Sequence, residues 1–404
     1  MAPLLLFALT YALIASRRLR LLPIGRPAGA LLGAFGMVAV GALSPAQSYA
    51  AINHDTILLL FSMMALTAYA AEAGAFERIA ALVLSRCKTG LSVLLGLNFV
   101  SGALAALLVN DTVAVFLTPV VVALCRQSGL PYGPFLIALA TSANIGSAAT
   151  AVGNPQNMLI AGLGDLSFGP FFALSGPAAA IGLSLNALLL YLYYGRGLRA
   201  PLPPRPTEPP AVYSSDLRWV SLAVLGVLIG FSLDLHLGYT ALGGVMLLMV
   251  VERREPAHVF ARIDWTLLVF FCCLFIVVEG FNTTGLPARA WASLAPSLEL
   301  GAPAGVAAFT ATMALGAQVV SNVPMVMLVG PHLTGAPPLT WVVLAFVLTV
   351  AGNLTLLGSV ANIIVAEPAR AHYPLGFREY LRFGLPSTLL VLSVGVPVIL
   401  WMAR

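Results

Sequence analysis

The sequence predicts an all-α polytopic membrane protein with two inverted structural repeats, each containing a re-entrant hairpin and a broken transmembrane helix. Of the 404 residues, 60% are hydrophobic and 9% are charged, whereas a soluble domain carries about 25% charged residues. Polar residues also interrupt an apolar region at 141–160, which reads TSANIGSAATAVGNPQNMLI. Because hydrocarbon cannot pair free backbone groups, we expect this Gly-, Pro- and Asn-containing break to line a cavity enclosed by protein.

Apolar segments long enough to span or enter the membrane recur along the chain. They run approximately over 2–15, 28–43, 55–74, 90–107, 134–153, 170–194, 217–232, 236–251, 265–281, 303–319, 339–357 and 383–402. No basic region precedes the first segment, so we interpret it as a membrane helix rather than a cleaved signal peptide. Two further stretches, 109–125 and 320–333, follow their predecessors too closely to be simple spans, and we interpret them as re-entrant hairpins.

Three matches in the same order indicate an internal duplication. SPAQSYAAIN at 44–53 matches EPAHVFARID at 255–264, an offset of 255 − 44 = 211. LVNDTVAVFL at 108–117 matches VSNVPMVML at 320–328 with the offset 321 − 110 = 211, and TAVGNPQNMLI at 150–160 matches TLLGSVANIIV at 355–365 with the offset 355 − 150 = 205. We therefore predict a first repeat at 1–194, a Pro-rich linker at 195–217 and a second repeat at 218–404.

Equivalent loops of the two repeats differ in charge. Loop 44–54 has no Arg or Lys, while 255–265 contains Arg262. Because basic loops favour one side of a membrane, equivalent loops are expected to face opposite sides. Inversion requires an odd number of crossings between equivalent positions, but six apolar segments run from 55 to 251. One of them is therefore expected not to cross fully, or two to merge.

Asp111 is the candidate residue for proton or cation coupling. From 89 to 164 the only charged side chains are Asp111 and Arg126, and a charged side chain at membrane depth costs roughly 2.5–3.5 kcal/mol on insertion scales. The alternative is that Asp111 caps the start of the hairpin helix.

Uncharged amides, hydroxyls and helix ends can solvate a polar solute without fixing a permanent charge. We expect the hairpin starts at Asn110 and Ser321 to approach each other and the breaks at 144–157 and 353–362. The candidate substrate-binding residues are Asn110, Thr112, Ser142, Asn144, Ser147, Thr150, Asn154, Asn157, Ser321, Asn322, Asn353, Thr355, Ser359 and Asn362.

The sequence contains no HExxH, CxxC or P-loop motif and no carboxylate cluster. We therefore expect no metal site, no cofactor and no enzymatic activity, which leaves ion-coupled transport or passive flux. The basic residues cluster in short loops, so they indicate membrane orientation rather than nucleic-acid binding. The expected partners are a small inorganic solute and the lipid bilayer, with a homodimer as the candidate assembly.

Four segments resemble the arsenite permease branch of the ion transporter superfamily. They are VNDTVAVFLTP (109–119), LATSANIGSAATAVGNPQNMLIA (139–161), SNVPMVML (321–328) and AGNLTLLGSVANIIVAE (351–367). The second is similar to a segment of plant silicon efflux transporters. The resemblance implies inverted repeats whose hairpins and broken helices meet at a central site. More distantly related divalent anion–sodium symporters carry Ser-Asn-Thr at their hairpin tips. The tips here read Asn110-Asp111-Thr112 and Ser321-Asn322-Val323. The first departs from Ser-Asn-Thr by an Asp and the second by a Val, which favours proton coupling through Asp111 over sodium-coupled dicarboxylate transport.

The first interpretation is a secondary active transporter in the plasma or bacterial inner membrane. It exports a small inorganic oxyacid of the arsenite or silicic acid type by proton antiport. The second is a sodium- or proton-coupled transporter of anions such as dicarboxylates or sulfate, which Arg126 would favour. A channel of the same architecture is the third.

Overall fold

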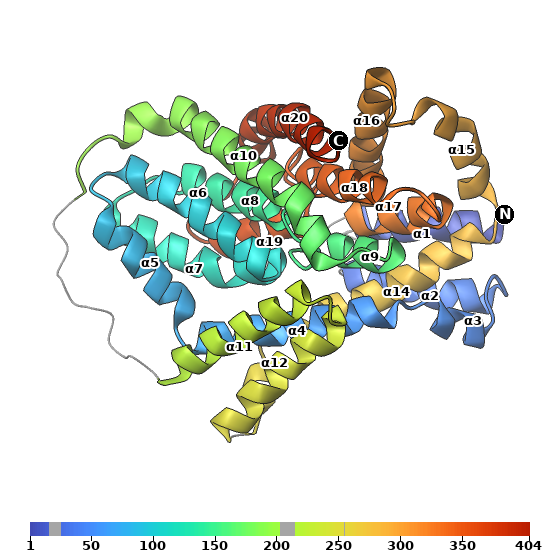
Figure 1. Cartoon of the computed structure of the whole chain (residues 1–404), viewed down its shortest axis with the longest axis horizontal. Helices are drawn as coiled ribbons and strands as arrows, with labels where there is room; N and C mark the ends of the chain where they lie inside the picture. Colours follow the sequence, from blue (N-terminus) through green and yellow to red (C-terminus); the bar gives the residue numbers. More distant parts are fainter. Residues whose placement is uncertain (16–25, 203–214, 254) are drawn as a thin grey trace.

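The computed structural model describes residues 1–15, 26–202, 215–253 and 255–404 (Figure 1). Within these ranges the chain forms helices and loops, with one isolated β-bridge between Thr89 and Pro201. This confirms the predicted all-α polytopic class. The described helices that are long and apolar enough to cross a membrane lie at His54–Glu72, Gly90–Leu107, Asn110–Ser128, Phe168–Leu198, Trp265–Asn282, Pro303–Val320 and Phe377–Met402.

Each helix of the first half has a counterpart in the second half, in the same order. The first set is α1 (Ala2–Ala15), α2 (Arg26–Ala39), α3 (Pro45–Ala50), α4 (His54–Glu72), α5 (Ala75–Arg86), α6 (Gly90–Leu107), α7 (Asn110–Ser128), α8 (Tyr132–Ser147), α9 (Pro155–Leu163) and α10 (Phe168–Tyr194). The second set is α11 (Ser215–Ser232), α12 (Leu237–Glu252), α13 (Ala257–Phe260), α14 (Trp265–Asn282), α15 (Leu286–Leu294), α16 (Pro303–Val320), α17 (Asn322–Val329), α18 (Pro338–Ala351), α19 (Val360–Ala369) and α20 (Phe377–Met402). For example, α4 starts at 54 and α14 at 54 + 211 = 265, while α9 starts at 155 and α19 at 155 + 205 = 360.

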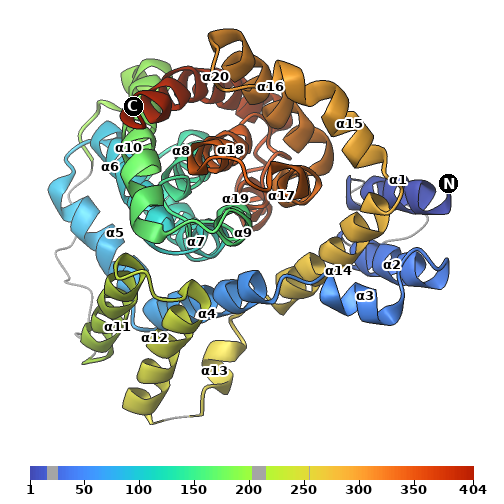
Figure 2. The same cartoon turned by 45° about the vertical axis from the view of Figure 1, so that its right-hand side comes forward.

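The helices of the two halves interleave in space (Figure 2). Helices α6–α10 and α16–α20 form a rounded bundle, in which α10 packs on α20 and α7 packs on α19. Helices α1–α4 and α11–α14 form a separate layer beside it, in which α2 packs on α14 and α12 packs on α4. Because each repeat contributes to both layers, neither repeat buries its own apolar faces alone. Residues 203–214 of the predicted linker lie outside the described residues.

The hairpins differ from the prediction in their extent. Segment 109–125 is not a hairpin by itself but part of the single helix α7. The chain reverses at Leu108 and Val109, and Gly90 at the start of α6 lies against Leu130 just after the end of α7. The hairpin therefore consists of α6 and α7 together. In the second half the same connection is Ser321, which joins α16 to α17, and a 3₁₀ turn at Gly330–Leu333 follows α17.

This correction resolves the count of crossings. The two arms of the hairpin, α6 and α7, together contribute either no crossing or two. The other crossings from α4 to α12 are α4, the broken helix α8–α9, α10, α11 and α12, so the total is odd in both cases. The direction of equivalent helices agrees with this. Helix α4 follows α3 and ends beside α13, where His258 Nε2 lies 3.6 Å from Glu72 Oε2. Helix α14 follows α13 and ends beside the end of α2, where Gly280 lies against Met37. Helices α4 and α14 thus run in opposite directions, as an inverted repeat requires; the orientation of the repeats in the membrane stays a prediction.

Candidate functional site

Four helices begin around one small cavity of about 30 Å³, which we call the central cavity. They are α7, α9, α17 and α19, and their first residues line the cavity together with Phe270, Phe271 and Leu274 of α14. We call Asn110 and Asp111 the first tip and Ser321 and Asn322 the second tip. Each helix N-terminus carries a partial positive charge of about +0.5 on its free N–H groups. The positive ends of four helix dipoles therefore meet at the cavity.

The first break, at 148–154, separates α8 from α9 and leaves backbone carbonyls without helical partners. The fully buried Asn157 replaces those partners: its Nδ2 donates to Ser147 O at 3.2 Å and to Thr150 O at 2.9 Å. One amide side chain thus bonds both to the last residue of α8 and to the middle of the break. A break in the helix can persist at this depth because the protein itself supplies the missing hydrogen bonds.

The second break, at 352–359, repeats this arrangement. Asn362 Nδ2 donates to Gly352 O at 2.8 Å and to Thr355 O at 3.1 Å. The three positions follow from the first break by the offset of the repeat: 157 + 205 = 362, 147 + 205 = 352 and 150 + 205 = 355. The duplication seen in the sequence is therefore also a duplication of hydrogen bonds.

Each half also bonds to the amide of the other half. Thr349 Oγ1 of α18 donates to Asn157 Oδ1 at 3.0 Å, and Asn144 Nδ2 of α8 donates to Asn362 Oδ1 at 3.0 Å. Since 144 + 205 = 349, these are the same contact made in both directions. Reciprocal contacts of this kind are the property of a two-fold related pair.

The N-cap residues of the two short helices make a second reciprocal pair. Asn154 Nδ2 donates to Thr349 Oγ1 at 3.2 Å, and Ser359 Oγ donates to Asn144 Oδ1 at 3.1 Å. Both caps also bond to a backbone N–H of the helix that they start, as N-caps do. The positions correspond because 154 + 205 = 359.

Asn144 makes additional bonds that its counterpart Thr349 does not share. It accepts from Asn110 Nδ2 at 3.0 Å and donates to Asn353 Oδ1 at 2.8 Å. The backbone N–H of Asn110 also donates to Gly153 O at 2.9 Å. Asn144 thus ties the first tip to the second break, and the backbone of Asn110 ties it to the first break.

Close backbone approach at the first break requires glycine. A Cβ on Gly146 would overlap the carbonyl and Cα of Gly102 on α6, and a Cβ on Gly153 would overlap the carbonyl of Ser147. The hairpin and the broken helix therefore meet at distances that exclude a side chain.

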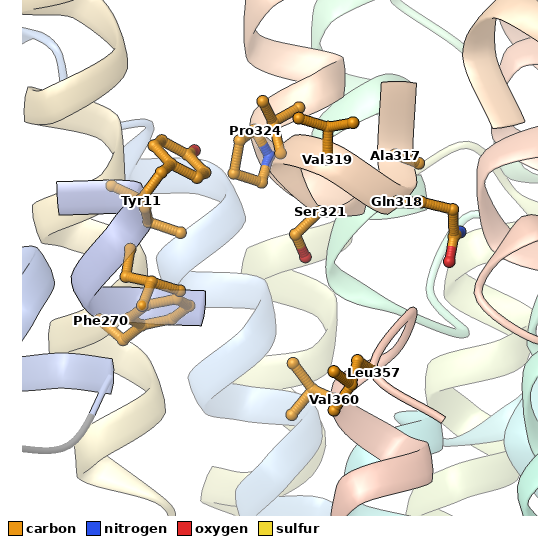
Figure 3. Close-up of a pocket in the computed structure, with 12 residues that line it drawn as sticks. Tyr11, Phe270, Ala317, Gln318, Val319, Ser321, Pro324, Leu357 and Val360 are labelled. Atoms are coloured by element: carbon orange, nitrogen blue, oxygen red, sulfur yellow. The ribbon is translucent and has the colours of Figure 1, made fainter. Parts of the chain in front are cut away.

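The two tips differ in access. In the first half Val109, Val113 and Val152 are fully buried, whereas Leu357, the counterpart of Val152, is 47% exposed. A second cavity of about 130 Å³, the side cavity, opens beside Ser321 between α1, α14, α16 and α19 (Figure 3). It shares Phe270, Leu274, Ser321, Pro324 and Val360 with the central cavity. The second tip is therefore less enclosed by protein than the first.

Asp111 is 5% exposed and lies in the first turn of α7. The N-cap of this helix is Val109, whose side chain has no hydrogen-bonding group, so Asp111 does not occupy the capping position. Its backbone N–H donates to Asn110 Oδ1 at 2.8 Å, and the residue lines the central cavity.

The structure sorts the predicted binding residues into three groups. Those lining the central cavity are Asn110, Asp111, Ser321, Asn322 and Ser359. Those bonded within the surrounding network are Asn144, Ser147, Asn154, Asn157, Asn353 and Asn362. The remaining four residues do neither. Ser142 contacts Ser101, Thr150 bonds to Ala106 O and Thr355 bonds to Gln318, while Thr112 is buried nearby. Direct contact of any of them with a solute stays a prediction.

Sequence analysis missed Thr349, Gln318 and Tyr11. Thr349 lies in the apolar helix α18, but the offset from Asn144 could have identified it. Gln318 Nε2 donates to Ala351 O at 2.9 Å and its Oε1 accepts from Thr355 Oγ1 at 3.0 Å, so it supports the second break. Tyr11 lines the side cavity.

Helices with enclosed polar interruptions, arranged around a small central cavity, define the class of multi-pass membrane transporters. The chain belongs to the CitMHS citrate transporter family, whose model matches residues 11–351. It is 32% identical over 499 residues to a Dictyostelium discoideum protein named transporter arsB, covering 95% of this chain and 88% of that one. It is 34% identical over 450 residues to the silicon efflux transporter LSI3 of Oryza sativa subsp. japonica, covering 94% of this chain and 93% of that one. These relatives confirm the predicted resemblance.

The crystal structure of the YdaH transporter of Alcanivorax borkumensis, described as having an unusual topology, is similar to the whole chain. The TM-score is 0.57 with 17% sequence identity, covering 99% of this chain and 96% of that one. This similarity supports the fold.

Proposed function

We propose that the protein is a secondary active transporter that exports a small inorganic oxyacid, of the arsenite or silicic acid type, in exchange for protons across the bacterial inner membrane. The observation that carries the proposal is the composition of the central cavity. Helix N-termini, amides and hydroxyls surround it, Asp111 is the acidic side chain that lines it, and no Arg, Lys or His is among its described lining residues.

A neutral oxyacid suits these groups. Its hydroxyls can donate to the Asp111 carboxylate and to side-chain oxygens, and its oxygens can accept from the N–H groups at the helix starts. A volume of about 30 Å³ holds about two water molecules, given that each needs about 10–15 Å³ by this measure. The central cavity therefore favours a solute of a few heavy atoms over a larger one.

Access along one tip supports transport by alternating exposure. The second tip lies beside the side cavity, whereas Asn110, Val113 and Val152, the counterparts of Ser321, Pro324 and Leu357, are buried. If the two repeats exchange these conformations, the central cavity opens to the opposite side. Asp111 lies on the first tip, so its exposure would change in that exchange. This is the requirement for a residue that couples proton movement to transport.

A coupled anion transporter is the second candidate. The four converging helix N-termini favour it, because together they can attract an anion when Asp111 is protonated. The name of the family, citrate transporter, agrees with this alternative. The two candidates differ in cargo charge and therefore in the current that accompanies transport.

Reconstitution into liposomes with an imposed pH gradient tests the proposal. The solutes are arsenite, silicic acid, sulfate, succinate and citrate, each measured with the gradient present and after an ionophore has collapsed it. The expected result is uphill movement of arsenite or silicic acid that stops with the collapse. Accumulation of sulfate, succinate or citrate alone would establish the anion transporter. Flux that persists without a gradient and never accumulates cargo would establish a channel.

A further inference from the structure

The side cavity is lined by Tyr11, whose hydroxyl has no role in the proposed function. Tyr11 lies on α1 in the layer beside the bundle, and Ser321 lies at the second tip; both line this cavity. Figure 3 shows Tyr11 and Phe270 on one side, and Ser321, Leu357 and Val360 on the other. The two hydroxyl-bearing residues thus come from different layers of the fold.

The Tyr11 side chain is held in place by its ring. The centroids of Phe7 and Tyr11 are 4.4 Å apart, and Phe7 in turn stacks on Phe281 of α14 at 4.0 Å. The Tyr11 hydroxyl is buried and has no hydrogen-bond partner among the described residues. A buried hydroxyl of this kind is satisfied when a polar molecule enters beside it.

The other polar groups of the side cavity divide into occupied and available ones. The Gln318 amide is occupied, because it bonds to the second break through both of its ends. Ser321 is exposed, and its hydroxyl points into the cavity in Figure 3. A cavity of about 130 Å³ is large enough for several water molecules or one small solute.

This polar wall is absent from the equivalent positions of the other half. The counterpart of α1 is α11, which reads SDLRWVSLAVLGVLIGFS and contains no tyrosine. The counterpart of Gln318 is Leu107, since 318 − 211 = 107. When the repeats exchange conformations, the corresponding vestibule would therefore lack the tyrosine hydroxyl.

We propose that the Tyr11 and Ser321 hydroxyls form an outer binding site for a hydroxyl-bearing neutral oxyacid, adjoining the central cavity and present on one side of the membrane only. The proposal rests on the proposed function for its cargo. Both hydroxyls can donate and accept, so they can bond to an oxyacid without fixing its protonation state. Cargo would bind here before passing between Phe270 and Val360 into the central cavity, which those two residues also line.

The test is Tyr11→Phe, which keeps the ring packing and removes the hydroxyl. The half-saturating concentration of arsenite and of silicic acid is measured from each side of liposomes in which the protein has one orientation. We expect it to rise about threefold to tenfold on one side, the change that one neutral hydrogen bond contributes, and to stay unchanged on the other. Tyr380→Phe is the matched control, because the Tyr380 hydroxyl is also buried without a described partner but lines neither cavity.

The outcomes separate this proposal from the proposed function. If the wild-type protein moves neither oxyacid, the proposed cargo is wrong. If it moves one of them, and Tyr11→Phe matches the wild type on both sides or shifts both sides equally, the one-sided outer site is wrong. Tyr11→Met provides a second variant without the hydroxyl, and size-exclusion chromatography of each variant checks that it is folded. Arsenite binding is also measured by the protection that it gives the protein against thermal unfolding. This binding should weaken in both Tyr11 variants and stay unchanged in Tyr380→Phe.

Discussion

Replacing Ser321 by glycine and by alanine separates two properties of the second tip, its backbone conformation and its hydroxyl. Ser321 has φ 72° and ψ 163°, a region that essentially only glycine occupies. Both variants remove the hydroxyl, but only glycine removes the Cβ that makes this conformation unfavourable. The difference in stability between them therefore reports the backbone strain.

Two effects oppose each other in that difference. A residue held in this region costs on the order of 1–3 kcal/mol, which glycine would release. Glycine also gives the unfolded chain more freedom than alanine, which lowers stability by about 0.4–1 kcal/mol. Strain is the larger effect, so we expect Ser321→Gly to be more stable than Ser321→Ala by about 1–2 kcal/mol.

The assay is reversible denaturant unfolding of both variants in the same detergent, with Ser393 as the matched control position. Ser393 lies exposed in the helix α20, where Ser393→Gly should be less stable than Ser393→Ala by about 0.5–1 kcal/mol. The expected signs at the two positions are therefore opposite. If glycine is the less stable substitution at Ser321 as well, the strain at the second tip does not exist and the reasoning is wrong.

Three further predictions concern the central cavity and the breaks. Asp111→Asn should abolish accumulation of cargo against a gradient while exchange of cargo partly survives, because the amide keeps the shape but cannot titrate; uphill transport with unchanged pH dependence would place the coupling elsewhere. Asn157→Ala and Asn362→Ala should each lower the free energy of unfolding by about 2–4 kcal/mol, because each frees two buried carbonyls and a bond to the other half; denaturant titration giving clearly unequal losses would contradict their equivalence. Gly146→Ala should cost about 1–3 kcal/mol because its Cβ would overlap the facing backbone, whereas Gly162→Ala, which faces open space, should be neutral or stabilising; equal melting temperatures would contradict the close approach.

The sequence is sufficient to predict that the tips and breaks converge, because polar residues at membrane depth must be enclosed by protein. Asn110, Asn144 and Ser321 were recognisable from polarity and repeat spacing alone. Asn157 and Asn362 are also predicted as site residues, but the prediction that they contact cargo rests only on their being polar. The structure shows both amides bonded to protein on every side. We therefore expect them to position the breaks.

The extent of the hairpins could not be predicted from local sequence. The arm at 90–107 is as apolar as a span, and the chain reverses at Leu108 and Val109, which carry no turn signal. The reversal is set by tertiary contact, because the N–H of Asn110 bonds to Gly153 O and Gly146 packs on the backbone of α6. Tyr11 was hidden for the same reason: nothing local distinguishes it from other aromatic residues of an apolar helix.

One departure from the duplication lies at the tips, and under the proposed function it gives transport a direction. The bonds that Asn157 and Asn362 make to the breaks and across the halves correspond in both halves, so they can serve equally in either conformation. The tips differ: position 111 is Asp, and its counterpart 111 + 211 = 322 is Asn. These side chains have nearly the same shape, so both tips can adopt the same two arrangements, but only one of them can release a proton. The energy of exchanging the two conformations then depends on the protonation of Asp111, which is the differential interaction that coupling requires.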